Sequence, residues 1–102
     1  MEYGGKCVVL VSQSGYSESH KALLRQFIDD GVELFCAQGK ECEKWEEAMD
    51  GLCVQLDASG EKPGAFCTTT CHPNESIEEV VEFAKNWNIH EGRYCDVKVF
   101  EI

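Results

Sequence analysis

The stretch that decides the fold is Cys7-Val8-Val9-Leu10-Val11, a continuous apolar run followed by a polar loop and an amphipathic helix. Because the run does not alternate between apolar and polar residues, it predicts a central strand, over 6–11, that is covered on both faces. The same order of strand, loop and helix occurs twice more, before a last strand-like segment over 95–102. Such alternation predicts a mainly parallel sheet with helices packed on it.

The fold class predicted for residues 1–102 is therefore α/β, a single three-layer domain in the order β-α-β-α-β-α-β. The second and third strands are expected over 32–37 and 65–69. The first helix is expected to end near Asp30, the second at Asp50-Gly51, and the third to begin at a capping box of Ser76 and Glu79. The sheet has four strands, or five if Leu52–Leu56 is a short extra strand. Alternation of polar and apolar residues in the last strand predicts an edge position.

Composition excludes several classes of function. The 102 residues are 43% hydrophobic and carry a net charge of −10, from nineteen acidic and nine basic side chains. A phosphate backbone is repelled by such a surface, so no nucleic acid is expected as a partner. No apolar run approaches the roughly 18 residues that a membrane span needs, and no secretion signal is evident. The sequence therefore predicts a cytoplasmic protein without a membrane partner.

The acidic residues are not placed where they would stabilise helices. Glu43 and Glu47, Glu46 and Asp50, and Glu78 and Glu82 are like-charge pairs four residues apart, each destabilising a helix by roughly 0.2–0.5 kcal/mol. A partner with a basic surface would explain that pattern. The leading hypothesis is therefore a small non-catalytic binding or regulatory module. It would act through acidic helix faces or the C-terminal edge of the sheet, with a homodimer as a further option.

A thiol function is one alternative. An odd number of cysteines without a secretion signal favours reduced thiols, most of them packed as small hydrophobic side chains; the seven are Cys7, Cys36, Cys42, Cys53, Cys67, Cys71 and Cys95. Cys71 lies between a strand and a helix and beside His72, and His20 comes from a neighbouring loop. These three are the candidate catalytic residues of a thiol enzyme, or of a redox switch centred on Cys71. No acidic residue is evidently spaced to orient either imidazole.

Metal binding is not predicted. Cys67 and Cys71 have a spacing that zinc ligands use, and Cys36 and Cys42 are possible companions. However, the chain has no C-x-x-C pair and no second histidine at ligand spacing, and Cys67 is expected within a strand. No metal site and no resident cofactor are therefore expected.

A second alternative is a phosphate-bearing ligand. The first loop reads Ser12-Gln13-Ser14-Gly15-Tyr16-Ser17, and hydroxyls with a glycine before a helix favour anion binding. The candidate ligand contacts are Ser12, Ser14, Gly15, Ser17 and, from a later loop, Thr70. The loop resembles the phosphate-binding loop of flavodoxins, which implies that a flavin or a nucleotide could bind there. The loop over 68–73 lacks the aromatic platform of that family.

A wider resemblance covers most of the chain. The segments 33–50 and 68–72, the latter reading Thr68-Thr69-Thr70-Cys71-His72, together with the helix that follows, are similar to a family of small uncharacterised bacterial proteins. Some members of that family are carried on mobile gene cassettes. The resemblance implies a single α/β domain of bacterial origin and a domain of unknown function, without an activity.

Overall fold

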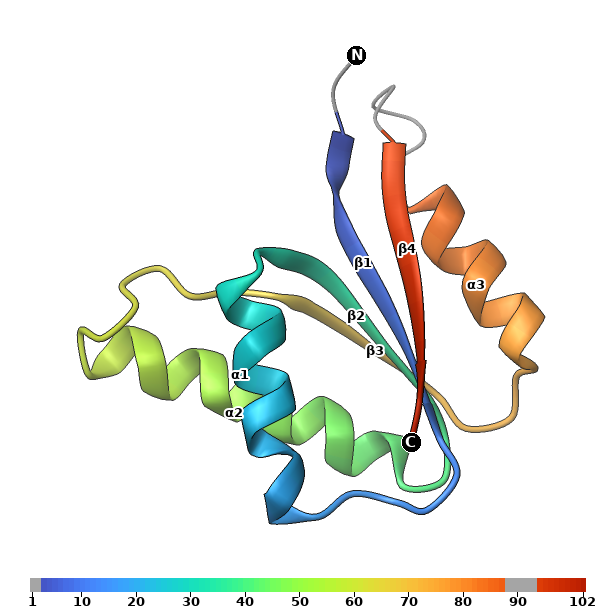
Figure 1. Ribbon diagram of the computed structural model, residues 1–102, viewed down its shortest axis with the longest axis horizontal. Helices are drawn as coiled ribbons and strands as arrows, with labels where there is room; N and C mark the ends of the chain where they lie inside the picture. Colours follow the sequence, from blue (N-terminus) through green and yellow to red (C-terminus); the bar gives the residue numbers. More distant parts are fainter. Residues whose placement is uncertain (1–2, 88–93) are drawn as a thin grey trace.

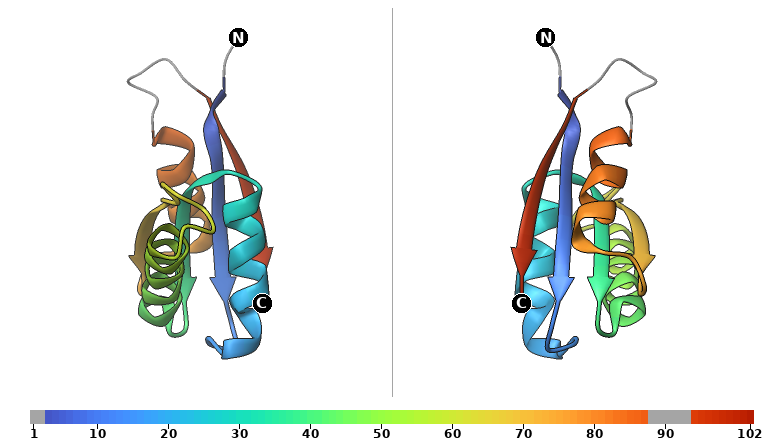
Figure 2. Two further views of the ribbon diagram at one scale, coloured as in Figure 1. Left: turned by 90° about the vertical axis from the view of Figure 1, so that its left-hand side faces the viewer. Right: turned by 90° about the vertical axis from the view of Figure 1, so that its right-hand side faces the viewer.

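The computed structural model describes the backbone of residues 3–87 and 94–102 and the side chains of 7–87 and 97–102. In this part of the chain, four strands alternate with three α-helices (Figure 1). The elements are β1 (Tyr3–Ser12), the short 3-10 helix η1 (Glu18–His20), α1 (Lys21–Asp29), β2 (Val32–Gly39), α2 (Cys42–Ala58), β3 (Thr68–His72), α3 (Ile77–Asn86) and β4 (Tyr94–Glu101). The strand order is β3-β2-β1-β4 and all neighbours are parallel, as the arrowheads in Figure 2 show. The predicted α/β fold is confirmed.

β1 is a central strand, as its apolar run predicts. Alternate side chains of a strand point to opposite faces of the sheet, and in β1 both sets are buried. Val8 and Leu10 pack with α1 and α2 in one core, whereas Val9 and Val11 pack beneath α3 in the other. The sheet is therefore the middle of three layers, with α1 and α2 on one face and α3 on the other (Figure 1). β4 is an edge strand, also as predicted.

The predicted end of the second helix is wrong. α2 continues through Gly51 to Ala58, and Leu52–Leu56 is helical rather than an extra strand. A continuous buried stripe holds the helix together across the exposed glycine, whose cost is only about 1 kcal/mol; the stripe consists of Cys42, Trp45, Met49, Cys53 and Leu56. The glycine that follows the helix end is Gly60, which has a φ of 78°.

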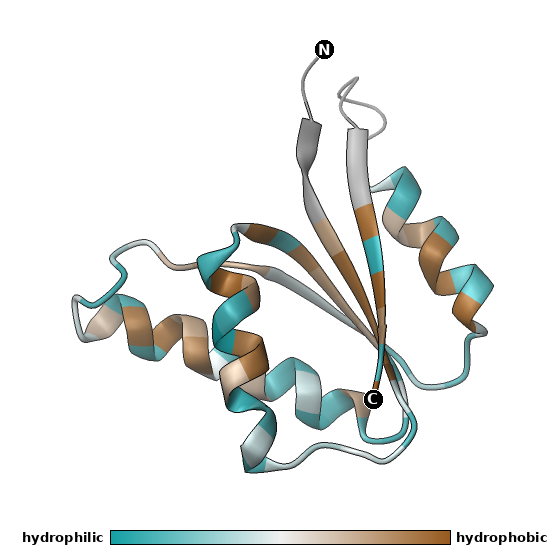
Figure 3. Ribbon diagram, viewed as in Figure 1, coloured by the Kyte–Doolittle hydropathy of each residue, from teal (hydrophilic) through white to brown (hydrophobic). Residues whose placement is uncertain are grey.

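β3 lies three residues later than predicted. The apolar segment over 65–67 precedes the strand, and pairing with β2 runs from Thr68 to His72. β3 is the second edge strand, and α3 packs on β4, β1 and β2. Threonines therefore suit β3 better than apolar residues do, and the strand is pale in Figure 3 whereas much of β1 is brown. The capping box of Ser76 and Glu79 at the start of α3 is confirmed.

The parallel arrangement brings the loops after β1, β2 and β3 to one edge of the sheet. The backbone N–H of Lys40 donates to the carbonyl oxygen of Ser12 at 2.9 Å, which joins the first two loops directly. Gly39 permits this approach, because a Cβ there would lie 2.6 Å from the same Ser12 oxygen. None of the helices in the described part of the chain combines the length and apolar character that a membrane crossing needs.

Candidate functional site

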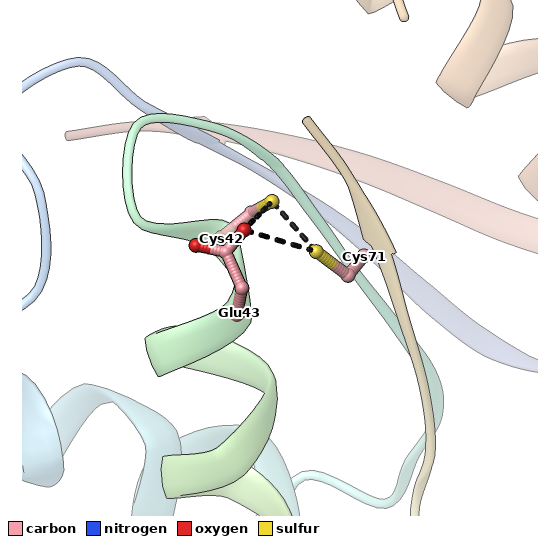
Figure 4. A group of neighbouring side chains, drawn as sticks. All are labelled: Cys42, Glu43 and Cys71. Carbon is pink, nitrogen blue, oxygen red and sulfur yellow. Dashed lines mark hydrogen bonds between the residues drawn. The ribbon is translucent and has the colours of Figure 1, made fainter. Parts of the chain in front are cut away.

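Two thiols from distant parts of the sequence meet at this edge. The Sγ atoms of Cys42, at the start of α2, and Cys71, in β3, lie 2.7 Å apart in a hydrogen bond (Figure 4). The Oε2 atom of Glu43 lies 3.7 Å from the Cys42 sulfur and 3.9 Å from the Cys71 sulfur. Cys42 is fully buried, Cys71 is partly exposed and Glu43 is exposed. The three side chains form a compact cluster that is open to solvent on one side.

The strand pairing explains why these residues meet. Cys71 is the register partner of Ala37 in β2, two residues before that strand ends. The chain then turns sharply at Glu41, whose φ of 56° is left-handed, and α2 begins at the next residue. The start of α2 is thereby placed beside the end of β3. Sequence reasoning missed Glu43 and considered Cys42 only as a possible companion ligand in a metal site that it then rejected, because no spacing along the chain indicates this contact.

The surroundings of Cys71 disfavour its ionisation. Burial is the main cause that raises the pKa of the Cys71 thiol to about 12, and the hydrogen bond with Cys42 and the nearby Glu43 carboxylate raise it further. A thiol that keeps its proton at neutral pH is a poor nucleophile. The geometry therefore does not favour the thiol enzyme centred on Cys71.

The cysteines whose side chains the structure describes are of two kinds, free and disulfide-bonded. Cys36, Cys42, Cys53, Cys67 and Cys71 are free thiols. Burial raises the pKa of Cys36 to about 11 and that of Cys67 to about 12, which is typical of structural cysteines in a core. Cys7 is disulfide-bonded. The expectation of reduced thiols therefore holds for those five residues and is wrong for Cys7.

His72 belongs to a separate hydrogen-bonded chain. Its Nε2 lies 2.7 Å from the Thr70 hydroxyl and its Nδ1 lies 2.7 Å from a carboxylate oxygen of Glu75. An acidic residue therefore does orient this imidazole, which the sequence did not reveal. His72 is buried and contacts Phe83 of α3, whereas Cys71 packs on the core beside α2. The two neighbours face opposite sides of β3, so His72 is not placed to activate the thiol.

His20 is held elsewhere. Its ring stacks on that of Trp45 at 4.7 Å, and its Nδ1 accepts a hydrogen bond from the backbone N–H of Ser17. The structure shows no bond from His20 to Cys71 within the described residues. Of the three candidate catalytic residues, only Cys71 lies in the thiol cluster.

The first loop is already filled by the protein's own carboxylate. An Oε1 atom of Glu41 accepts a hydrogen bond of 3.0 Å from the backbone N–H of Tyr16 and lies against Gly15, leaving no room for a Cβ. Lys44 lies 2.9 Å from the same carboxylate. The Lys44 ammonium, and then the Tyr16 N–H, lower the pKa of Glu41. Glu41 thus takes the place in which an external anion would contact this loop.

The serines of the loop do not converge on a ligand. Ser12 is buried, and its hydroxyl accepts a hydrogen bond of 3.0 Å from the indole N–H of Trp45. Ser14 and Ser17 are exposed, and the Ser17 hydroxyl bonds to that of Ser19. Thr70 is bonded to His72 rather than facing the loop. The geometry therefore does not favour the flavin or nucleotide site.

The whole chain matches one known family model. The match covers residues 1–101, and the family is described as a domain of unknown function, DUF7684. The chain belongs to this family. No curated protein and no solved structure matches it. Membership agrees with the expected family of uncharacterised single domains, while the bacterial origin and the mobile cassettes stay predictions. The family supplies no specific role, so any function has to be argued from the site.

Proposed function

We propose that this protein is a small non-enzymatic regulatory module whose state is set by a reversible disulfide between Cys42 and Cys71. The observation that carries the proposal is the 2.7 Å separation of their sulfur atoms. A disulfide bond measures about 2.05 Å, so a movement of well under 1 Å closes it. Cys42 would thus supply the second thiol that a redox switch at Cys71 requires.

The oxidant is a low-molecular-weight disulfide, R–S–S–R. The partly exposed Cys71 is the thiol that such a molecule reaches first. Because the raised pKa of Cys71 leaves only a small fraction as thiolate, this step is slow: the thiolate attacks one sulfur of the reagent, forms a mixed disulfide and releases one R–SH. The Cys42 thiolate then attacks the Cys71 sulfur and releases the second R–SH. The two protons leave the protein on the two released thiols, and two excess R–SH molecules reverse the reaction.

Closing this bond changes how firmly α2 is attached. The crosslink joins the first residue of α2 to β3, across the turn that Glu41 makes. A loop of this length is expected to stabilise the protein by about 3–4 kcal/mol in the chain-entropy model. The acidic start of α2 is fixed in the oxidised form and freer to move in the reduced form. A partner that reads this surface would therefore distinguish the two states.

Equilibration in thiol–disulfide buffers tests the proposal. We expect reduced protein treated with the cationic disulfide cystamine to yield a Cys42–Cys71 crosslink, found by peptide mass spectrometry. The reaction with anionic oxidised glutathione should be slower, because the Glu43 and Glu46 carboxylates lie near Cys71. Oxidation should also raise the melting temperature.

Cys71→Ser should abolish both effects, and Cys53→Ala, which changes a buried thiol outside the pair, should leave them intact. A crosslink that forms only in urea, or that joins other cysteines, would show that the pair is a packing contact.

A second candidate function, which a separate observation favours, is binding of a basic partner through α2. Glu43, Glu46 and Glu47 take part in no ion pair within the described residues, whereas the carboxylates of Asp29 and Glu61 are paired with Arg25. Unpaired acids at the start of one helix keep their charge available for a cationic partner.

Binding of a lysine-rich peptide, measured by titration calorimetry at several salt concentrations, tests this second function. Glu43→Gln together with Glu47→Gln should weaken binding, and Glu78→Gln together with Glu82→Gln on α3 should not. Equal loss in both variants would indicate attraction by net charge alone.

A further inference from the structure

We propose that, in the reduced protein, Cys42, Cys71 and Glu43 form a binding site for a thiophilic divalent cation of the zinc class. The ligand atoms are the two sulfurs and a carboxylate oxygen, which all lie within 4.8 Å of one another (Figure 4). The site shares its thiols with the proposed switch but does not depend on their oxidation. No metal site is predicted from the sequence, because the chain has no C-x-x-C pair and no second histidine at ligand spacing, although Cys42 is among the possible companions of Cys71.

The separations of the donor atoms support this assignment. Tetrahedral zinc, with bonds of about 2.3 Å to sulfur and 2.0 Å to oxygen, places a sulfur and an oxygen about 3.5 Å apart. The Glu43 oxygen already lies 3.7 and 3.9 Å from the two sulfurs. Two of the three edges of the coordination triangle are therefore close to their final lengths in the metal-free protein.

The third edge must open. The two sulfurs lie 2.7 Å apart because one thiol donates to the other, whereas two zinc-bound thiolates lie about 3.8 Å apart. The metal displaces both thiol protons, so the hydrogen bond is lost and the two anionic sulfurs separate. Cys71 is the side chain that moves, since it is partly exposed and Cys42 is fully buried.

The negative charge around the cluster favours its metal-bound form over its metal-free form. The carboxylate of Glu43 lies 3.9 Å from the Cys71 sulfur, and its negative charge attracts a divalent cation to the space between the sulfurs. Sulfur donors select zinc-class metals over calcium and magnesium, which prefer oxygen. The exposed Glu43 leaves a path for entry, and solvent supplies the fourth ligand.

A titration of the reduced, tag-free protein tests the site. We expect one Zn²⁺ per chain in competition with a chromophoric chelator, with release of two protons. Cd²⁺ should produce an ultraviolet thiolate charge-transfer band of the intensity of two sulfurs. Cys71→Ser should weaken binding by more than about 100-fold, and Glu43→Gln by about 10–100-fold, because a metal ligand contributes at least as much as the groups that orient it.

Matched variants separate this site from nonspecific binding and from the switch. Glu78→Gln removes a carboxylate on α3 and Cys53→Ala a buried thiol, so both variants should bind zinc as the wild type does. Glu43→Gln should lose metal affinity yet still form the Cys42–Cys71 disulfide, which distinguishes failure of the metal site from failure of the switch. Zinc binding that survives Cys71→Ser, or a thiolate band insensitive to it, would overturn the proposal. Circular dichroism confirms that each variant is folded.

Discussion

The loop after β1 and the end of β3 lie at the same edge of the sheet but differ in what they leave free. In the first loop, the Tyr16 N–H and the space beside Gly15 are both taken by the Glu41 carboxylate, and the Ser12 hydroxyl is bonded to Trp45. At the end of β3, the Cys71 thiol has one thiol partner, a distant carboxylate and partial exposure.

This difference shows that a loop with the composition of a binding site need not be one. Hydroxyls and a glycine before a helix bind anions only when their donors are unoccupied. Here the Glu41 carboxylate accepts the hydrogen bond of the Tyr16 N–H, and this contact attaches the first loop to the start of α2. The thiol cluster, whose groups have fewer hydrogen-bond partners, is where side chains remain able to react or to bind a ligand. Substitutions in and around the first loop measure whether it is as closed as its hydrogen bonds indicate.

The largest effect on the free energy of unfolding is expected at Trp45, whose indole bonds to Ser12 at the start of the first loop. Trp45 is fully buried and donates to Ser12, so Trp45→Ala leaves both a cavity and a hydroxyl without its donor. We expect a loss of about 3–5 kcal/mol in the free energy of unfolding, measured with urea. Trp87→Ala, at the half-buried end of α3, is the control and should cost less. Equal costs would contradict the structural role given to Trp45.

A smaller effect is expected at Gly15. Its φ is 88°, and an added Cβ would meet the Glu41 carboxylate, so Gly15→Ala should cost about 2–3 kcal/mol. Gly31 has a φ of 80° with open space around it, so Gly31→Ala measures the backbone strain alone, about 1 kcal/mol. In a Glu41→Ala background the extra cost at Gly15 should vanish. If it persisted, Glu41 would not be what fills the loop.

The contribution of Glu41 should depend on pH. Its pKa is lowered in the folded state from an ordinary value of 4.5, so its contribution to stability is fully present above that pH. The contribution is lost as the pH falls through the folded pKa. Urea unfolding of the wild type and Glu41→Gln at several pH values should show a difference at pH 7 that disappears in acid. A constant difference would mean that the effect is steric rather than ionic.

The smallest effect is expected at Tyr16. Its hydroxyl is buried and has no hydrogen-bond partner within the described residues. Tyr16→Phe should therefore leave the stability unchanged or raise it by up to about 1 kcal/mol, measured by thermal unfolding. A clear loss of stability would reveal a partner for the hydroxyl and reopen the first loop as a ligand site.

The fold could be predicted from local patterns because each depends on nearby residues. The run over 7–11 indicated a central strand, and Ser76 with Glu79 indicated the start of α3. Errors arose where tertiary burial outweighed a local signal. Asp50-Gly51 is typical of a helix end, but Met49 and Cys53 are buried on either side and the helix continues. The threonines of β3 gave no apolar signal, because β3 is an edge strand whose residues before His72 are only partly buried.

The candidate site was predictable only in part. The alternation of strands and helices predicted a parallel sheet, whose loops gather at one edge, and it placed Cys71 at that edge. Cys42 was only one of several possible companions and Glu43 was not named, since both reach Cys71 through strand pairing rather than through sequence spacing. The same holds for Glu41, whose left-handed backbone turns its carboxylate into the first loop.

The amino-acid sequence by itself determined the alternation of strands and helices, the central position of β1 and the acidic surface, because periodicity and composition act over a few residues. Only the tertiary structure decided which polar groups are satisfied and which are not. Hydrogen bonds at the loop edge join residues dozens of positions apart. The residue that satisfies a given polar group therefore cannot be identified from its neighbours in the chain. The Glu41 carboxylate thus occupies the anion site predicted in the first loop, and Cys42 lies beside Cys71 at the predicted thiol site.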